Sequence, residues 1–325
     1  MEYTRVGQSG LKISAVVVGC MSFGDPARGS HSWTLPLQAS RTVIARALEL
    51  GVTTFDTANV YSDGSSEEIL GQVLGELAHR EDVVIATKVQ GRMRPGPNGA
   101  GLSRVAILHE IDASLRRLRT DYVDLYQIHR FDPDVPIEET MEALHDVVRA
   151  GKARYIGASS MYTWQFAQMQ HAAKANGWTP FISMQDQYNL ISREEEREMH
   201  PFCLDQGIGV LPWSPLARGK LTRAWDASTA RSSVDEFGKS LYHQAEEADH
   251  RVVDAVAAVA RARKVSRAQV ALAWVAQQDA VTAPIVGATR PQHLEDAVAA
   301  VDLLLSDEEV DLLQRHYVPH AVEGF

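Results

Sequence analysis

Four residues with side chains suited to acid–base chemistry each end or follow a short apolar run of this sequence. They are Asp56, Tyr61, Lys88 and His129. A lysine ammonium close to a tyrosine favours the phenolate form, which makes the hydroxyl a better proton donor. An aspartate would hold the lysine protonated, and a neutral histidine would donate a hydrogen bond to a carbonyl oxygen. Together these side chains could deliver a proton to a carbonyl, with Tyr61 as the general acid.

Short apolar runs alternate with amphipathic segments along the chain. The runs are rich in Val and Ile and cover residues 15–19, 53–57, 83–89, 123–129, 153–159, 182–187, 209–213 and 282–287. The segments between them have helical spacing, as at Ile107, Ile111 and Leu115. Eight strands separated by helices predict an α/β fold of the (β/α)8 or TIM barrel type. A doubly wound sheet is less favoured, because no GxGxxG follows the first strand.

Three further features add detail to this barrel. Two strand-like stretches around Arg5 and Lys12, joined by turn residues 8–10, predict a short N-terminal β-hairpin. The long polar stretch 214–245 predicts a loop insertion at the carboxyl-terminal face of the barrel. Ser65 and Glu68 have the spacing of a capping box, which predicts the start of a helix. We find no linker, so residues 1–325 are expected to form a single domain.

The barrel would bring the four chemical side chains together, because the active site of such a barrel lies at the carboxyl ends of its strands. Strand residues alternate between two faces, so Lys88 shares a face with Ala86, and His129 shares one with Gln127. Lys88 and His129 are therefore both expected to point inward. A buried charge needs partners, and a cluster of these side chains would supply them.

Composition limits the partners of this protein. The 325 residues carry a net charge of -10, whereas nucleic-acid binding depends on clustered Lys and Arg, so no nucleic acid is expected. Cys20 and Cys203 lie far apart and outside any CxxC spacing, so neither a disulfide framework nor a metal site is predicted. The N-terminal residues do not read as a signal peptide, and no apolar run approaches the ~20 residues of a membrane span. We expect a cytoplasmic protein without a membrane partner.

Asp56, Tyr61, Lys88 and His129, in this order and at these strand ends, resemble the catalytic tetrad of the aldo-keto reductases. The stretches GASS at 157–160, QDQYN at 185–189 and PWSPLARG at 212–219 are similar to cofactor motifs of that family. The resemblance covers the whole chain. It is greatest to a bacterial branch named for 1-deoxyxylulose 5-phosphate synthesis, and the chain also resembles aryl-alcohol dehydrogenases and potassium channel β subunits. It implies reduction of aldehydes or ketones to alcohols with NADP(H), and NAD(H) is less favoured.

The resemblance also implies how the cofactor is held. Ser159 and Gln185 would bind the nicotinamide carboxamide and Trp213 would stack under the ring, while Ser160 stands where the family usually has Asn. Loop 214–219 and Arg231 would hold the pyrophosphate. The implied cofactor-binding residues are Cys20, Met21, Asp56, Ser159, Ser160, Gln185, Trp213, Ser214, Pro215, Leu216, Ala217, Gly219, Arg231, Gly287, Thr289, Arg290, His293 and Asp296. Taken alone, Trp213 also fits a core residue and Ser159 a helix N-cap.

The stretch GATRPQHLED at 287–296 resembles the family's site for the adenosine 2'-phosphate. Thr289 and Arg290 would hold that phosphate, which favours NADP over NAD. His293 and Ala297 depart from the residues usual in the family.

The substrate implied by this chemistry is a small carbonyl compound. Trp33 and Phe325 would form aromatic walls beside Tyr61 and His129. The sequence does not identify the carbonyl compound, and it leaves the oligomeric state open, with a homo-oligomer allowed.

Three arginines near the expected site, Arg92, Arg94 and Arg130, could hold an anionic substrate group. Strand parity turns Arg130 away from the face of His129, so solvated surface roles are favoured for all three. The charged run 193–198 is expected to be a solvent-facing helix start.

Two other functions stay open at this stage. One is a nucleotide-sensing regulatory subunit, although that group usually lacks a histidine at the place of His129. The other is a sugar-phosphate-converting enzyme of the 1-deoxyxylulose 5-phosphate type, which would require a substrate that carries a phosphate.

Overall fold

A computed structural model describes residues 1–29, 31–229, 234–242 and 245–322 of the chain. One parallel sheet has eight strands in the order β10-β3-β4-β5-β6-β7-β8-β9. These are β3 (Val17–Gly19), β4 (Thr54–Asp56), β5 (Val84–Val89), β6 (Val123–Ile128), β7 (Ala153–Ser159), β8 (Phe181–Gln185), β9 (Gly209–Val210) and β10 (Ile285–Gly287). A parallel bridge between Val210 and Val281 joins β9 to the residues before β10 and closes the sheet. The predicted (β/α)8 barrel is confirmed.

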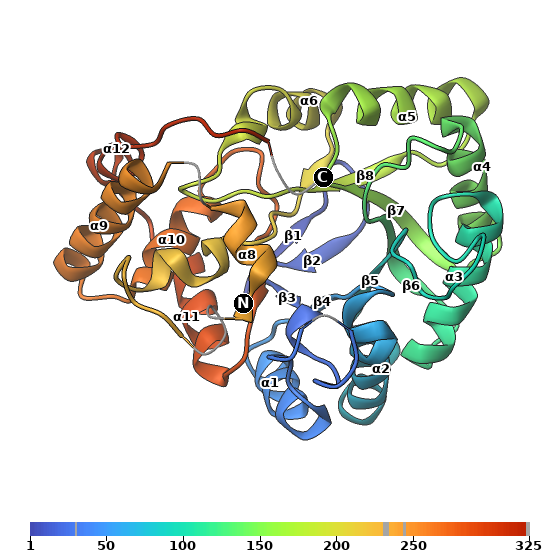
Figure 1. The fold of residues 1–325 in the computed structure, drawn as a ribbon, viewed down its shortest axis with the longest axis horizontal. Helices are drawn as coiled ribbons and strands as arrows, with labels where there is room; N and C mark the ends of the chain where they lie inside the picture. Colours follow the sequence, from blue (N-terminus) through green and yellow to red (C-terminus); the bar gives the residue numbers. More distant parts are fainter. Residues whose placement is uncertain (30, 230–233, 243–244, 323–325) are drawn as a thin grey trace.

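Helices surround the barrel (Figure 1). In α3, for example, Ile107 and Ile111 are fully buried, because an amphipathic helix packs its apolar face on the barrel. The helices are α1 (Leu37–Glu49), α2 (Ser65–Leu77), α3 (Arg104–Leu118), α4 (Ile137–Arg149), α5 (Thr163–Asn176), α6 (Met199–Gln206), α8 (Glu236–Leu241), α9 (Glu246–Arg263), α10 (Arg267–Ala276), α11 (Pro291–Val301) and α12 (Asp307–Gln314). Short 3-10 helices are η1 (Cys20–Ser22), η2 (Tyr61–Gly64), η3 (Arg80–Asp82), η4 (Glu194–Glu196) and η5 (Ala217–Thr222). Within the described ranges, no helix has both the length and the apolar character needed to cross a membrane.

The predicted N-terminal hairpin lies across the inside of the ring in Figure 1. Its strands, β1 (Tyr3–Arg5) and β2 (Lys12–Ser14), pair antiparallel. Leu11 and Ile13 pack in one buried cluster with Leu125 of β6. Leu125 lies near the start of β6 and points into the barrel. The hairpin that packs on it therefore closes the end of the barrel where the strands begin. The carboxyl-terminal end is left for polar side chains.

The segment that carries Tyr61 has an unusual backbone. Inside η2, Ser62 and Asp63 have φ angles of 48° and 50°, and Gly64 follows with φ 84° as the N-cap of α2. Two non-glycine residues in the left-handed region are costly, and they persist only where the surroundings fix them.

The predicted capping box at the start of α2 is wrong. The Ser65 hydroxyl donates to the backbone oxygen of Ser62 at 2.8 Å, and no side chain caps the helix. Glu68 pairs instead with Arg28 at 2.8 Å. A contact with a residue 40 positions away has replaced the local cap.

Buried carboxylates connect α2 and α3 to the barrel. The fully buried Glu67 accepts a hydrogen bond from Arg117 Nε at 2.6 Å and one from the Thr87 hydroxyl of β5 at 2.5 Å. Glu110 of α3 accepts from Asn59 Nδ2, in the segment after β4, at 3.3 Å. The network thus links β5 and the segment leading to Tyr61 with the same helix.

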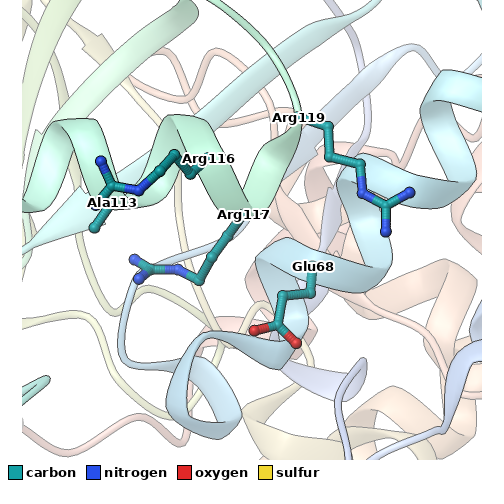
Figure 2. A pocket seen from close by; sticks show the side chains of 5 residues that line it. All are labelled: Glu68, Ala113, Arg116, Arg117 and Arg119. Carbon is teal, nitrogen blue, oxygen red and sulfur yellow. The ribbon is translucent and has the colours of Figure 1, made fainter.

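Figure 2 shows Arg117 beside Arg116 and Arg119, with Glu68 of α2 across from them. With Ala113 these residues line a surface cavity of about 330 Å³ between α2 and α3. Arg116 is exposed, whereas the Arg117 guanidinium reaches the buried Glu67 carboxylate. The cavity is therefore part of the helix packing around the barrel and not of the strand ends.

Arg117→Leu is expected to lower the free energy of unfolding by about 3–5 kcal/mol, because it leaves the Glu67 carboxylate buried without its cation. Equilibrium urea unfolding measures this loss. The matched control Arg116→Leu, which removes an exposed guanidinium from the same helix, should change stability by less than about 0.5 kcal/mol. Equal losses in the two variants would contradict the role given to the buried pair.

Candidate active site

A buried ion pair lies at the carboxyl ends of β4 and β5. Lys88 Nζ is 2.5 Å from Asp56 Oδ1, and the two side chains are 0% and 5% exposed. The same nitrogen donates to the backbone oxygen of Thr57 at 2.9 Å and to the Tyr61 hydroxyl oxygen at 3.2 Å. An ammonium has three hydrogens, so these three acceptors satisfy it and fix its direction toward Tyr61.

The second carboxylate oxygen of Asp56 is held by two amides. Gln127 Nε2 and Gln185 Nε2 each donate to Asp56 Oδ2 at 2.9 Å. The register pairs Lys88 with Gln127 on neighbouring strands, so both side chains point into the barrel. Gln127 was not among the predicted site residues, although its place at the end of an apolar strand was the signal that could have found it.

The charges around Lys88 determine its protonation. Burial by itself acts to lower the pKa of Lys88, but Asp56 and Tyr61 raise it, and the result lies above the ordinary value for lysine. Lys88 is therefore a cation at neutral pH, which the chemistry expected of Tyr61 requires.

His129 directly follows β6 and faces Tyr61. The two ring centroids are 5.7 Å apart at an interplanar angle of 79°, and the His129 backbone N–H donates to the oxygen of Val89 at 2.8 Å. Burial lowers the pKa of His129 well below its ordinary value, and the charges of Lys88 and Arg130 lower it further. The imidazole is therefore neutral at neutral pH and has one ring hydrogen to donate.

The residues predicted to hold the nicotinamide group lie at three neighbouring strand ends. Ser159 and Gln185 are register partners on β7 and β8, and both are buried. Trp213 Nε1 donates to the Ser160 hydroxyl at 3.0 Å, so the residue in the place of the usual Asn supports the indole. Tyr162 is the N-cap residue of α5, so Ser159 is not the N-cap of that helix.

Loop 214–219, predicted to hold the pyrophosphate, turns sharply after Trp213. Its positive φ angles, between 48° and 94°, fall at Ser214, Ala217, Arg218 and Gly219. Successive turns of this kind can gather backbone N–H groups into a concave anion-binding surface. Pro215 and Leu216 lie between them, and two hydrogen bonds of 2.7 Å from Arg218 to Asp235 connect the loop to a later part of the predicted insertion.

Cys20 and Met21 lie in η1, directly after β3. Cys20 is fully buried, and its backbone oxygen accepts from the Ser66 hydroxyl at 2.8 Å. Burial, with a smaller contribution from Asp56, raises the pKa of the Cys20 thiol well above its ordinary value, so it stays protonated. Both cysteines of the sequence, Cys20 and Cys203, are free thiols.

The predicted adenosine site surrounds the start of α11. Arg290 is the exposed N-cap residue of this helix, and the Thr289 N–H donates to His293 Nδ1 at 3.3 Å. Asp296 accepts from the Ser266 hydroxyl at 3.2 Å, which connects it to the start of α10. Thr289 and Arg290 are thus together at a helix N-terminus, where an anion is favoured.

Of three further predicted residues, Trp33, Arg231 and Phe325, the structure describes only Trp33. Trp33 is partly buried against His31, with ring centroids 5.0 Å apart. Arg231 and Phe325 lie outside the described residues, so their roles stay predictions.

The surface role expected for Arg130 is wrong. Its guanidinium carbon lies 6.0 Å from the centre of the Trp213 ring, and Nη1 donates to the backbone oxygen of His129 at 2.6 Å. The residue is only partly exposed, and burial lowers its pKa. Parity does turn its backbone position away from His129, but the long side chain reaches back over the indole. Arg92 is exposed and Arg94 is partly buried, and both donate to carbonyl oxygens of their own loop.

A second buried ion pair, which the sequence did not reveal, lies behind the predicted nicotinamide site. His200 Nε2 of α6 is 2.9 Å from Asp186 Oδ2, and the side chains are 6% and 1% exposed. The backbone oxygen of Asp186 accepts from the Trp213 N–H at 2.7 Å, and Asp186 directly follows Gln185. Burial acts to lower the pKa of His200, but Asp186 raises it above the ordinary value. The pair therefore holds Asp186, which directly follows Gln185 and accepts from the Trp213 N–H.

The run 193–198 is also not a solvent-facing helix start. It contains η4, and Glu194 Oε1 accepts from the Tyr317 hydroxyl at 2.6 Å. Burial, with Asp186 and Glu194, raises the pKa of Glu195 to about 9, so this carboxyl is protonated at neutral pH. The run connects the C-terminal segment to the barrel.

Known proteins resemble this chain over almost its whole length. The model of the aldo/keto reductase family matches residues 15–318. A versiconal hemiacetal acetate reductase from Aspergillus parasiticus is 46% identical, over 99% of this chain and 98% of the relative. An aldo-keto reductase from Metarhizium robertsii is 42% identical, over 100% of this chain and 93% of the relative. A putative aryl-alcohol dehydrogenase from Saccharomyces cerevisiae is 40% identical, over 98% of each chain.

His200→Gln is expected to lower the free energy of unfolding by about 3 kcal/mol near pH 6, because the Asp186 carboxylate loses its buried cation. The raised pKa of His200 means that this stabilisation is complete below the ordinary histidine value, about 6.5, and is lost as the pH rises through the raised value. Urea unfolding from about pH 6 to about pH 9 should show the difference from wild type shrinking. The exposed His171→Gln is the control, and a difference that grew with pH would contradict the charged pair.

Proposed function

Because the chain belongs to the aldo/keto reductase family, we propose that it reduces aldehydes or ketones to alcohols with NADP(H), and that Tyr61 gives the proton. The observation that carries this proposal is the position of Lys88 Nζ, which bonds to both Asp56 and Tyr61 at the strand ends. Carbonyl reduction also agrees with the names of the reductase relatives.

Three features of the described residues fit a nicotinamide cofactor. Trp213 is held by Ser160 and is only partly buried, so its indole offers a flat face for a ring. The turns of loop 214–219 suit a pyrophosphate. A Cβ built on Gly287 would meet no atom within 4 Å, which leaves open space next to the exposed Arg290. The bound cofactor would supply the hydride.

The side chains of this protein then manage the proton. Tyr61 donates its hydroxyl proton to the substrate oxygen, and the Lys88 ammonium stabilises the phenolate that remains. Asp56 keeps Lys88 cationic and directed at the phenol. The neutral His129 donates its ring hydrogen to the same substrate oxygen, which polarises the carbonyl and positions it beside Tyr61.

The hydrogen bonds of Gln185 sharpen its proposed role. Its Nε2 donates to Asp56 at 2.9 Å and to Gln127 Oε1 at 3.3 Å, so both amide hydrogens are already engaged. We therefore assign the carbonyl oxygen of Gln185 to the carboxamide N–H of the nicotinamide. Gln185 would then connect the cofactor directly to the ion pair.

We further propose that residues 1–325 are one domain, since the family model spans most of that length. A cytoplasmic location is proposed on the two free, buried cysteines.

Tyr61→Phe should reduce turnover of aldehydes by about 10²–10⁴-fold, because the proton donor is removed while the ring remains. The dissociation constant of NADPH, from fluorescence titration, should stay near that of wild type. Tyr3→Phe, at an exposed tyrosine on the N-terminal hairpin, is the control. Unchanged turnover in Tyr61→Phe would rule out the mechanism.

The same assay separates the two other functions. NADPH oxidation over a panel of aldehydes, ketones and sugar phosphates measures reduction directly. Slow turnover on every carbonyl, with tight cofactor binding and a stable partner protein, would favour a nucleotide-sensing subunit. Conversion of a sugar phosphate without net NADPH consumption would favour the 1-deoxyxylulose 5-phosphate type of enzyme.

Arg290→Gln should weaken NADPH binding by about 10-fold or more, since a charge-assisted hydrogen bond to the 2'-phosphate is lost. NADH lacks that phosphate, so its dissociation constant should change less than about 2-fold. Arg315→Gln, at an exposed arginine in the C-terminal segment, is the control for charge alone. Equal weakening of NADPH and NADH would contradict the assignment of Arg290.

A further inference from the structure

We propose that Arg130 binds an anionic group of the substrate, so that carbonyl compounds carrying a carboxylate are reduced in preference to neutral ones. This inference rests on the proposed function, because it names the substrate class of the same site. It assigns to Arg130 a role in specificity that lies beside the acid–base chemistry of Tyr61.

The first argument is the absence of a carboxylate partner for a partly buried guanidinium. A cation withdrawn from water normally has an anion to replace the lost hydration. Three other partly buried arginines show this, in the pairs Arg117 with Glu67, Arg193 with Glu196 and Arg218 with Asp235. Over the ranges that the structure describes, no carboxylate pairs with Arg130.

The second argument is the position of the Arg130 guanidinium. It lies over the ring of Trp213 and bonds to the backbone oxygen of His129, whose ring centroid is 5.7 Å from that of Tyr61. A group bound there would lie beside the proton donor. The cation would therefore meet a substrate substituent and not bulk solvent.

The third argument is the balance of charge. Lys88 and Arg130 are the two cations that act on His129. Asp56 neutralises Lys88 through a hydrogen bond at 2.5 Å. The charge of Arg130 stays uncompensated, so this part of the barrel is positive although the whole chain carries a net charge of -10. A local positive field of this kind favours an anionic ligand.

The test compares 4-carboxybenzaldehyde with its neutral methyl ester, methyl 4-formylbenzoate, in wild type, Arg130→Gln and Arg130→Lys. Arg130→Gln should lower kcat/KM for the acid by about 10-fold or more, mainly through KM, and for the ester by less than about 3-fold. Arg130→Lys, which keeps the charge, should recover part of the loss. Arg92→Gln is the control for an exposed arginine nearby.

Several outcomes would overturn the proposal. An equal loss on the acid and the ester would mean that Arg130 merely supports His129 and Trp213. No loss on either substrate would mean that the guanidinium serves no ligand. A large fall in NADPH affinity in Arg130→Gln would assign the cation to the cofactor.

A binding measurement separates failure of this inference from failure of the proposed function. Titration of benzoate, with benzamide as the neutral match, into the cofactor-loaded protein needs no turnover. If no carbonyl is reduced but benzoate binds about 10-fold more weakly to Arg130→Gln than to wild type, the anion site stands and the reductase function fails. Equal benzoate affinity in the two proteins would overturn the anion site alone.

Discussion

The ion pair between Lys88 and Asp56 sets the conditions for the whole candidate site. Two charges inside a barrel are tolerated only when hydrogen bonds replace the water that they have lost. Lys88 meets this condition with three acceptors, and Asp56 meets it with amides from β6 and β8. Satisfying one buried charge pair therefore fixes four strand ends relative to one another. The Tyr61 hydroxyl is held in place as one of the acceptors.

The parts of the fold that could be predicted are those that depend on local pattern. Apolar runs and amphipathic segments gave the eight strands and the helices, because burial of one helix face leaves a period in the sequence. The order of Asp56, Lys88 and His129 along these runs then placed them at one end of the barrel. Strand bounds were less predictable, since regular pairing of β9 stops at Val210 while the apolar run continues to Trp213.

The features that could not be predicted all depend on partners far away in the sequence. Glu68 has the spacing of a cap but pairs with Arg28, and His200 pairs with Asp186 across a loop. The charged run at 193–198 is held by Tyr317 through contacts more than a hundred residues apart. Arg130 shows a different limit, because strand parity fixes the Cβ direction of a residue but not where a long side chain ends.

The electrostatics of His129 and of Arg130 are two consequences of the same arrangement. Burial and two neighbouring cations keep the imidazole neutral, which a hydrogen-bond donor to a carbonyl requires. Asp56 compensates one of those cations, and its oxygens are already used by Lys88, Gln127 and Gln185. Its single negative charge is balanced by Lys88, so it does not neutralise a second cation. The arginine that helps to keep His129 neutral is therefore also the group that makes the site receptive to an anion.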